Sequence, residues 1–226
     1  MSRLSDEQIA SREKTLRASV FLSVWAPLTT GIAVLLSRST TQLADFIRRT
    51  IELVALVVSY GVFRYVKRGA TPDDAESARL ESIAGYFVAA ALTISGLVMI
   101  VVAIARVGTF EPGGNVYPGL AIATLGLIVN SWFWRRYARL NREQFSAIMA
   151  AQSKLYRAKS MVDVAVIAAL TSVAIDPTHP ATQYIDITGS LAVAFYLLWS
   201  GLRAAREARS SAETSLQQCK SHADPA

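Results

Sequence analysis

The stretch ADFIRRTIE (Ala44–Glu52) decides the fold of this chain, because it opens an apolar run that continues to about Val66. The uncharged part of that run, from Leu53 onward, holds only about fourteen residues, whereas a membrane-spanning helix needs about 20. The span must therefore begin near Ala44 and include the charged residues. Arg48 and Glu52 are one helical turn apart, where opposite charges can pair. Ionisable side chains at membrane depth are costly and rarely face lipid, so this face should point into the protein.

The composition is that of an integral membrane protein. Of the 226 residues, 52% are hydrophobic, and they come in long apolar blocks that soluble helices do not show. The sequence predicts an all-α protein, a bundle of six transmembrane helices, at about 18–37, 44–66, 81–106, 117–135, 156–176 and 184–204. Residues 1–17 are expected to form a cytoplasmic N-terminal segment, residues 18–205 the transmembrane domain, and residues 206–226 a short polar cytoplasmic tail. That tail is too short to be a soluble domain.

The net charge of +6 might suggest a nucleic-acid partner, but its distribution indicates a membrane topology. Lysine and arginine are concentrated in the N-terminal segment, the second and fourth connections and the tail. The alternate connections hold only Arg38, with Arg106 at the edge of the third span. This positive-inside pattern predicts that both termini are cytoplasmic. We therefore expect the lipid bilayer as partner, no nucleic acid, and a location in the bacterial inner membrane.

Cysteine and histidine are scarce in this sequence. The single Cys219 excludes an intrachain disulfide and a cysteine metal cluster. The two histidines are His179, in an outer turn, and His222, in the tail. Neither lies near a candidate nucleophile, so an intramembrane enzyme is disfavoured and no catalytic residue or cofactor is expected.

The fifth span repeats the pattern of the second. Its apolar run, Met161–Ile175, is too short to cross a bilayer unless Asp163 and Lys159 lie inside, and these two are again an acid and a base one turn apart. Three explanations compete: a substrate or ion pathway, a structural ion-pair network, and basic side chains that reach the headgroups. Arg49 is interpreted as such a headgroup-reaching side chain. Glu52 and Asp163 have short side chains well inside their spans and need partners.

Several short stretches, taken in order, carry a family resemblance. Ala44 and Asp45 are followed by Arg48 and Glu52, and Lys159 precedes Asp163 by four residues. The other stretches are Arg79-Leu80-Glu81, Leu125–Asn130, Asp186 and Leu197–Arg203. With this order and spacing, residues from about Thr15 to Ala208 resemble the transmembrane domain of the cation diffusion facilitators, which export zinc, iron and manganese. The second-helix motif of that family is Ala-Asp-x-x-His/Asp-x-x-x-Asp, and its fifth-helix motif is His-x-x-x-Asp.

The departures from the family pattern fall on its metal site. The resemblance implies one tetrahedral site, built from two residues of each motif, with the His and Asp ligands that zinc prefers. Here the first residue of each pair is a cation, Arg48 or Lys159, and an arginine cannot give up its proton. Only Glu52 and Asp163 remain as oxygen ligands if a cation binds. We expect ion pairs Arg48–Glu52 and Lys159–Asp163, within or across the two helices, to occupy the place of the metal, so a divalent metal is disfavoured.

The expected function is a membrane transporter related to the cation-efflux proteins, such as an antiporter, that moves a cation or a proton-coupled solute by alternating access. The four charged residues would line its pathway, with Asp45, Arg49 and Asn130 as nearby polar residues. Lys159 could carry the coupling proton, because burial shifts a lysine pKa. The alternative is a non-transporting relative that serves as a structural or regulatory partner. The family implies a homodimer, and Ser95 and Gly96 could form a helix contact either between chains or within one.

Overall fold

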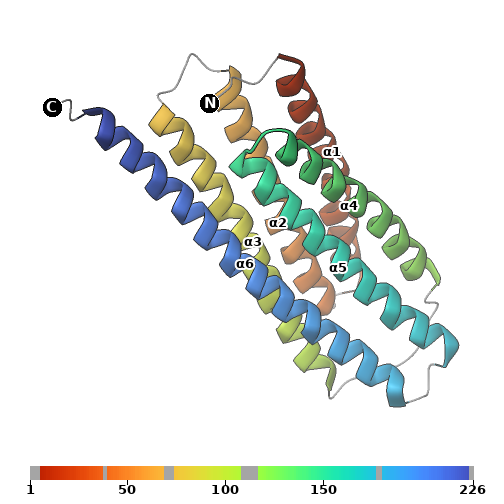
Figure 1. The fold of residues 1–226 in the computed structure, drawn as a ribbon. Coiled ribbons are helices and arrows are strands. Elements are labelled where there is room, and N and C mark those ends of the chain that lie inside the picture. The colour runs from red at the N-terminus through yellow and green to blue at the C-terminus, as the bar shows by residue number, and fades with distance from the viewer. Residues whose placement is uncertain (1–5, 38–39, 69–73, 108–116, 177–179, 224–226) are drawn as a thin grey trace.

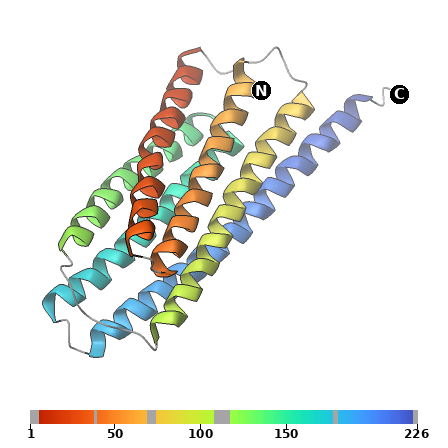
Figure 2. The same cartoon turned by 180° about the vertical axis from the view of Figure 1, so that it is seen from behind.

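The computed structural model describes residues 6–37, 40–68, 74–107, 117–176 and 180–223, and these residues form six helices. They are α1 (Asp6–Ser37), α2 (Thr40–Arg68), α3 (Asp74–Val107), α4 (Tyr117–Glu143), α5 (Ala147–Ile175) and α6 (Pro180–Ala223). The helices lie side by side in one elongated bundle, and both chain termini lie at the same end of it (Figures 1 and 2). The prediction of an all-α, six-helix protein is confirmed for the described part of the chain.

Most of the helices extend beyond the expected spans. α1 begins at Asp6, so residues 6–17 continue the first helix, and α6 runs to Ala223 through most of the polar tail. By length and apolar composition, three helical segments of the described residues could cross a membrane: Arg79–Ala105, Ala147–Ile175 and Ile187–Ser210. α2 is not among them, which agrees with its short uncharged run.

α3 and α6 pack closely along their length, as both views show (Figures 1 and 2). A Cβ added to Gly201 of α6 would come within 2.4 Å of Thr93 Oγ1 on α3, and one added to Gly96 of α3 would come within 2.9 Å of Leu198 on α6. Small residues of this kind let transmembrane helices approach closely. Gly96 therefore makes a contact within the chain, one of the two alternatives that the sequence left open.

Two apolar cores flank the charged part of the bundle. One joins α3, α5 and α6 and includes Ala55 of α2, and the other joins α1, α2, α4 and α5 and includes Leu56. The second core contains the rings of Phe133, Tyr137 and Tyr156, with centroids 5.0 to 6.2 Å apart. Ala55 and Leu56 lie about one turn from Glu52, so α2 carries its carboxylate between the two cores.

Polar contacts fasten the helices together near the end that holds the termini. Arg12 of α1 is fully buried, and its Nη2 donates hydrogen bonds to the carbonyl oxygens of Leu140 (2.8 Å) and Gln144 (2.7 Å) where α4 ends. Burial lowers the pKa of Arg12, although Glu143 and Glu81 act in the opposite direction, and an arginine stays protonated in a protein.

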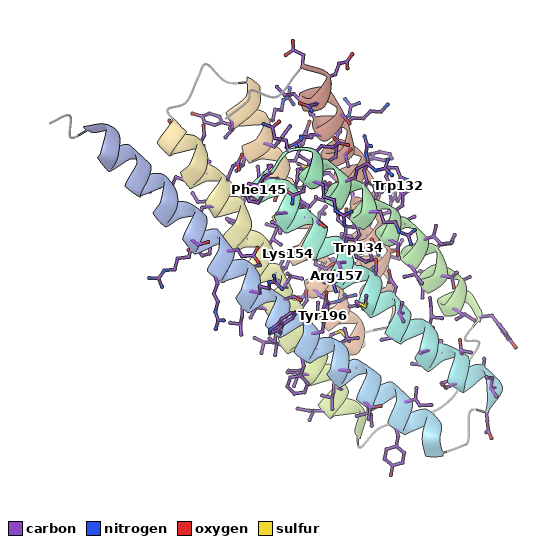
Figure 3. All side chains as sticks on the ribbon, viewed as in Figure 1. Trp132, Trp134, Phe145, Lys154, Arg157 and Tyr196 are labelled. Atoms are coloured by element: carbon purple, nitrogen blue, oxygen red, sulfur yellow. The ribbon has the colours of Figure 1, made fainter. Side chains whose placement is uncertain are left out.

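A second polar contact joins α5 to α6. Lys154 of α5, labelled in Figure 3, forms an ion pair with Glu207 of α6. The other carboxylate oxygen of Glu207 accepts a hydrogen bond from Arg203 Nε at 3.1 Å. The carboxylate of Glu207 therefore lies between two basic side chains.

Candidate functional site

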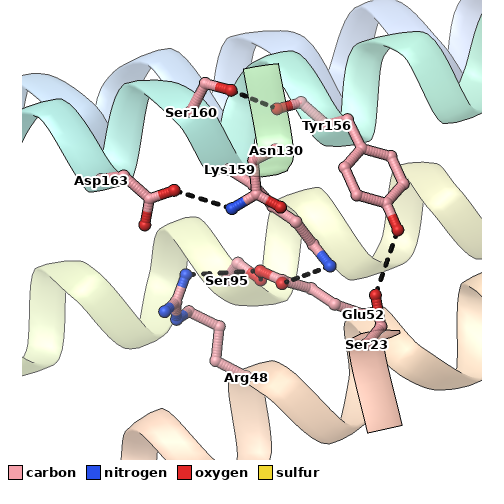
Figure 4. Close-up of polar contacts among 9 residues, drawn as sticks. All are labelled: Ser23, Arg48, Glu52, Ser95, Asn130, Tyr156, Lys159, Ser160 and Asp163. Carbon is pink, nitrogen blue, oxygen red and sulfur yellow. Dashed lines mark hydrogen bonds and ion pairs between the residues drawn. The ribbon is translucent and has the colours of Figure 1, made fainter. Parts of the chain in front are cut away.

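The four charged residues singled out in the sequence lie close together where α2 faces α5 (Figure 4). Arg48 and Glu52 of α2 are buried, with 8% and 6% of their surface exposed. Lys159 and Asp163 of α5 are partly buried, and Lys159 reaches across to α2. The charged face of α2 thus points into the protein, as expected from the cost of exposing charges to lipid.

Glu52 is the centre of this cluster. Its Oε1 is 3.4 Å from Arg48 Nη1 and accepts a hydrogen bond from Ser95 Oγ of α3 at 3.3 Å. Its Oε2 is 3.3 Å from Lys159 Nζ. A buried carboxylate must be paired and hydrogen-bonded to offset its lost hydration, and Glu52 finds partners on three helices.

Lys159 pairs across the helix interface with Glu52 and not with Asp163 of its own helix. Its Nζ lies 5.1 Å from the centroid of the Tyr156 ring, one turn earlier on α5. Helical side chains lean toward the N-terminus of their helix, which directs Lys159 toward Tyr156 and away from Asp163. The expected Arg48–Glu52 pair therefore forms within α2, and the expected Lys159–Asp163 pair is replaced by Lys159–Glu52.

Asp163 has a neutral partner. Its Oδ2 accepts a hydrogen bond of 2.7 Å from Asn130 Nδ2 on α4. Gly126, one turn before Asn130, makes room for this carboxylate, since a Cβ there would lie 3.3 Å from both carboxylate oxygens. The two acids of the cluster thus differ: Glu52 contacts two cations, whereas Asp163 contacts an amide.

Of the nearby polar residues expected from the sequence, the structure describes the side chains of Asn130 and Arg49 but not that of Asp45. Asn130 contacts Asp163 directly. Arg49 is partly buried and takes part in a polar or electrostatic contact. Its positive charge attracts the carboxylate of Glu52. The side chains of Asp45, Asp186, Cys219 and His222, and the whole of His179, lie outside the described part of the chain.

Sequence reasoning did not assign three other side chains to the cluster. Ser95 donates to Glu52, and Ser23 of α1 shares a hydrogen bond of 3.1 Å with the hydroxyl of Tyr156. Of these, the sequence singled out only Ser95, as a small residue that could form a helix contact. Nothing in their local sequence indicates which of the many serines in the spans faces a carboxylate.

As a set of ligands, the cluster suits a metal ion poorly. Within the described residues, no three His, Cys, Asp or Glu side chains gather in one place. Both oxygens of Glu52 face a basic group, and a divalent cargo ion placed there would be repelled by Arg48 and Lys159 by several kcal/mol, even at an effective dielectric of about 20. The cluster is instead suited to exchange a proton or to hold α2, α3 and α5 together.

The family model of the cation efflux transmembrane domain matches residues 16–211. No curated protein matches the chain significantly. The matched region contains the whole charged cluster, and it covers most of the chain.

Proposed function

Because this chain belongs to the family of the cation efflux transmembrane domain, we propose that it is a membrane transporter in which resident basic side chains replace the metal of the site. The observation that carries the proposal is the position of Glu52 between Arg48 and Lys159. The family consists of transporters rather than enzymes. The finer points, namely alternating access, proton coupling and exchange of a cation for a proton, are our proposal.

Charge balance favours a monovalent cargo over a divalent one. Two acids and two bases make the cluster neutral when all four are ionised. If Lys159 gives up its proton, the cluster carries one negative charge, which one monovalent cation bound at Glu52 would balance. A divalent ion would leave an excess positive charge in a low-dielectric interior, which is costly. Lys159 is our candidate for the proton carrier because an ammonium group, unlike the guanidinium of Arg48, has a proton that it can give up.

The test is cation-driven proton movement in proteoliposomes with an internal pH dye. We expect sodium or potassium gradients to move protons through the wild type, and Lys159→Met and Glu52→Gln to abolish the signal. Lys154→Met, a matched change on the same helix outside the cluster, should keep it. Equal activity of the wild type and Lys159→Met would contradict the proposal.

A second candidate is a non-transporting structural or regulatory partner. It is favoured by the same geometry, because Glu52 ties α2 to α3 and α5 and could lock the bundle. Under this alternative neither the wild type nor any of the variants moves protons, and Glu52→Gln only lowers thermal stability. The liposome assay separates the two candidates.

We also propose that both termini face the cytoplasm of a bacterial inner membrane and that the protein is a homodimer. The basic side chains of the bundle half nearer the termini support the topology: Lys14, Arg17, Arg64, Arg135 and Arg139. Arg157, labelled in Figure 3, lies 5.7 Å from the centroid of the Trp134 ring. The single Cys219 gives the test, since a membrane-impermeant maleimide should label it in inverted vesicles and not in spheroplasts.

A further inference from the structure

The interface of α2 and α5 holds a second polar contact, two helical turns from the ion pair. Ser59 follows Glu52 by seven residues, and Gln152 precedes Lys159 by seven, so both pairs lie on the same helix faces, about 10 Å apart along the axis. Gln152 Nε2 donates a hydrogen bond of 2.8 Å to Ser59 Oγ, and both residues are fully buried. α2 ends and α5 begins toward the end of the bundle that carries the termini (Figure 1), so the second contact lies on that side of the cluster.

The hydrogens of this contact can be assigned. Ser59 Oγ donates its only hydrogen to the carbonyl oxygen of Ala55, at 2.8 Å, so it can only accept from Gln152. This fixes the amide orientation, with Nε2 toward Ser59 and Oε1 turned away. Gln152 Oε1 is buried and has no donor among the described protein atoms. A buried acceptor without a donor is costly, so the position favours a donor from outside the chain.

We propose that Gln152 Oε1 binds a buried water molecule, and that this water is a station between the Lys159–Glu52 pair and the end of the bundle that carries the termini. Water is the ligand that fits, because it is small, neutral and a donor. A charged ligand is disfavoured, since Met149 and Leu155, within a turn on α5, are apolar and fully buried. The water site rests on the geometry alone, and its place on a transport route rests on the proposed function.

Tyr156 lies on α5 between the Gln152–Ser59 contact and the Lys159–Glu52 pair. It lies one turn after Gln152 on α5, and its ring lies beneath Lys159 Nζ. Its side chain is 1% exposed, so bulk solvent does not reach it. Any chemistry that requires water beside Tyr156 must therefore use water held inside the bundle.

The experiment is hydroxyl-radical labelling by X-ray radiolysis of the purified protein, read by mass spectrometry, with water itself as the source of radicals. We expect Tyr156 to be labelled in the wild type despite its burial. Gln152→Met, which has similar length but no acceptor oxygen, should lower that labelling at least about fivefold. Tyr196 on α6 is the internal reference and should be labelled equally in both proteins. An unlabelled Tyr156 in the wild type, or equal labelling in Gln152→Met, would overturn the proposal.

Two further measurements keep the test decisive. If Gln152→Met fails to fold, Gln152→Leu is a second uncharged side chain without an acceptor oxygen and should lower the labelling of Tyr156 likewise; unchanged labelling would count against the site. In the liposome assay, Gln152→Met should slow proton movement while Lys159→Met abolishes it. The labelling does not depend on transport, so failure of the transport assay alone would remove the proposed function and leave the water site standing.

Discussion

At the scale of single residues, Glu52 is the side chain on which the charged cluster depends. Arg48 and Lys159 both pair with it, and Ser95 donates to it from a third helix. Removing one partner of a buried ion pair leaves the other charge uncompensated, which costs more than the pair contributes as a whole. The effects of changing Glu52 and Lys159 should therefore not be additive.

We predict that Glu52→Gln destabilises the protein by about 3–5 kcal/mol, because it removes the carboxylate that Arg48 and Lys159 share. Adding Lys159→Met to that variant should recover part of the loss, since the ammonium group that pairs with Glu52 is then removed as well. Thermal unfolding in detergent measures both effects, and Glu76→Gln at an exposed position is the control. Strictly additive losses in the double variant would show that the two side chains are not coupled.

The charged residues of the cluster could be predicted from the sequence, but only one of their two pairings could. Short apolar runs around Glu52 and Asp163 require these acids to lie inside the membrane region, and four-residue spacing indicates the Arg48–Glu52 contact. The same spacing predicts Lys159–Asp163 equally well, and only the packing of α5 against α2 decides that Lys159 crosses to Glu52.

At the scale of helices, the approach of α3 and α6 depends on glycine. A Cβ at Gly201 would meet Thr93 Oγ1, the Thr93 backbone nitrogen at 3.0 Å and the Ala89 oxygen at 3.1 Å. We predict that Gly201→Ala forces the helices apart and costs about 1–3 kcal/mol. Gly189→Ala, on the same helix with nothing within 4 Å, should be neutral or slightly stabilising. Melting temperatures compare the two variants, and an unchanged value for Gly201→Ala would contradict the tight packing.

The first turns of α1 behave as part of the bundle, because Arg12 reaches two carbonyls at the end of α4. We predict that Arg12→Met lowers the free energy of unfolding by about 1.5–3 kcal/mol, the worth of hydrogen bonds from a charged donor. Arg17→Met, an exposed position on the same helix, should have little effect. Equal thermal stability of the two variants would show that the contacts of Arg12 contribute nothing.

Helix content and order could be predicted from apolar runs, but the ends of the helices could not. The apolar runs indicate which residues can contact lipid, but the helices extend beyond those runs: α1 starts at Asp6 and α6 continues to Ala223. Charged residues such as Arg12 do not end a helix, and their burial is decided by a partner more than a hundred residues away.

At the scale of the whole molecule, the chain is a helical bundle of the cation efflux family in which two basic side chains, Arg48 and Lys159, contact the carboxylate of Glu52. The number of helices could be predicted from the apolar runs, and the family from the order and spacing of the short motifs. That Arg48 and Lys159 stand where the family has metal ligands is also evident from the sequence. That both pair with the carboxylate of Glu52 is evident only from the three-dimensional structure.

The most direct test is calorimetric titration of the purified protein with zinc. We predict no tight site in the wild type, and a single tight site per chain in the double variant Arg48→His/Lys159→His, because two imidazoles beside Glu52 and Asp163 restore a ligand set that zinc prefers. A tight stoichiometric zinc site in the wild type that disappears in Glu52→Gln would contradict the account.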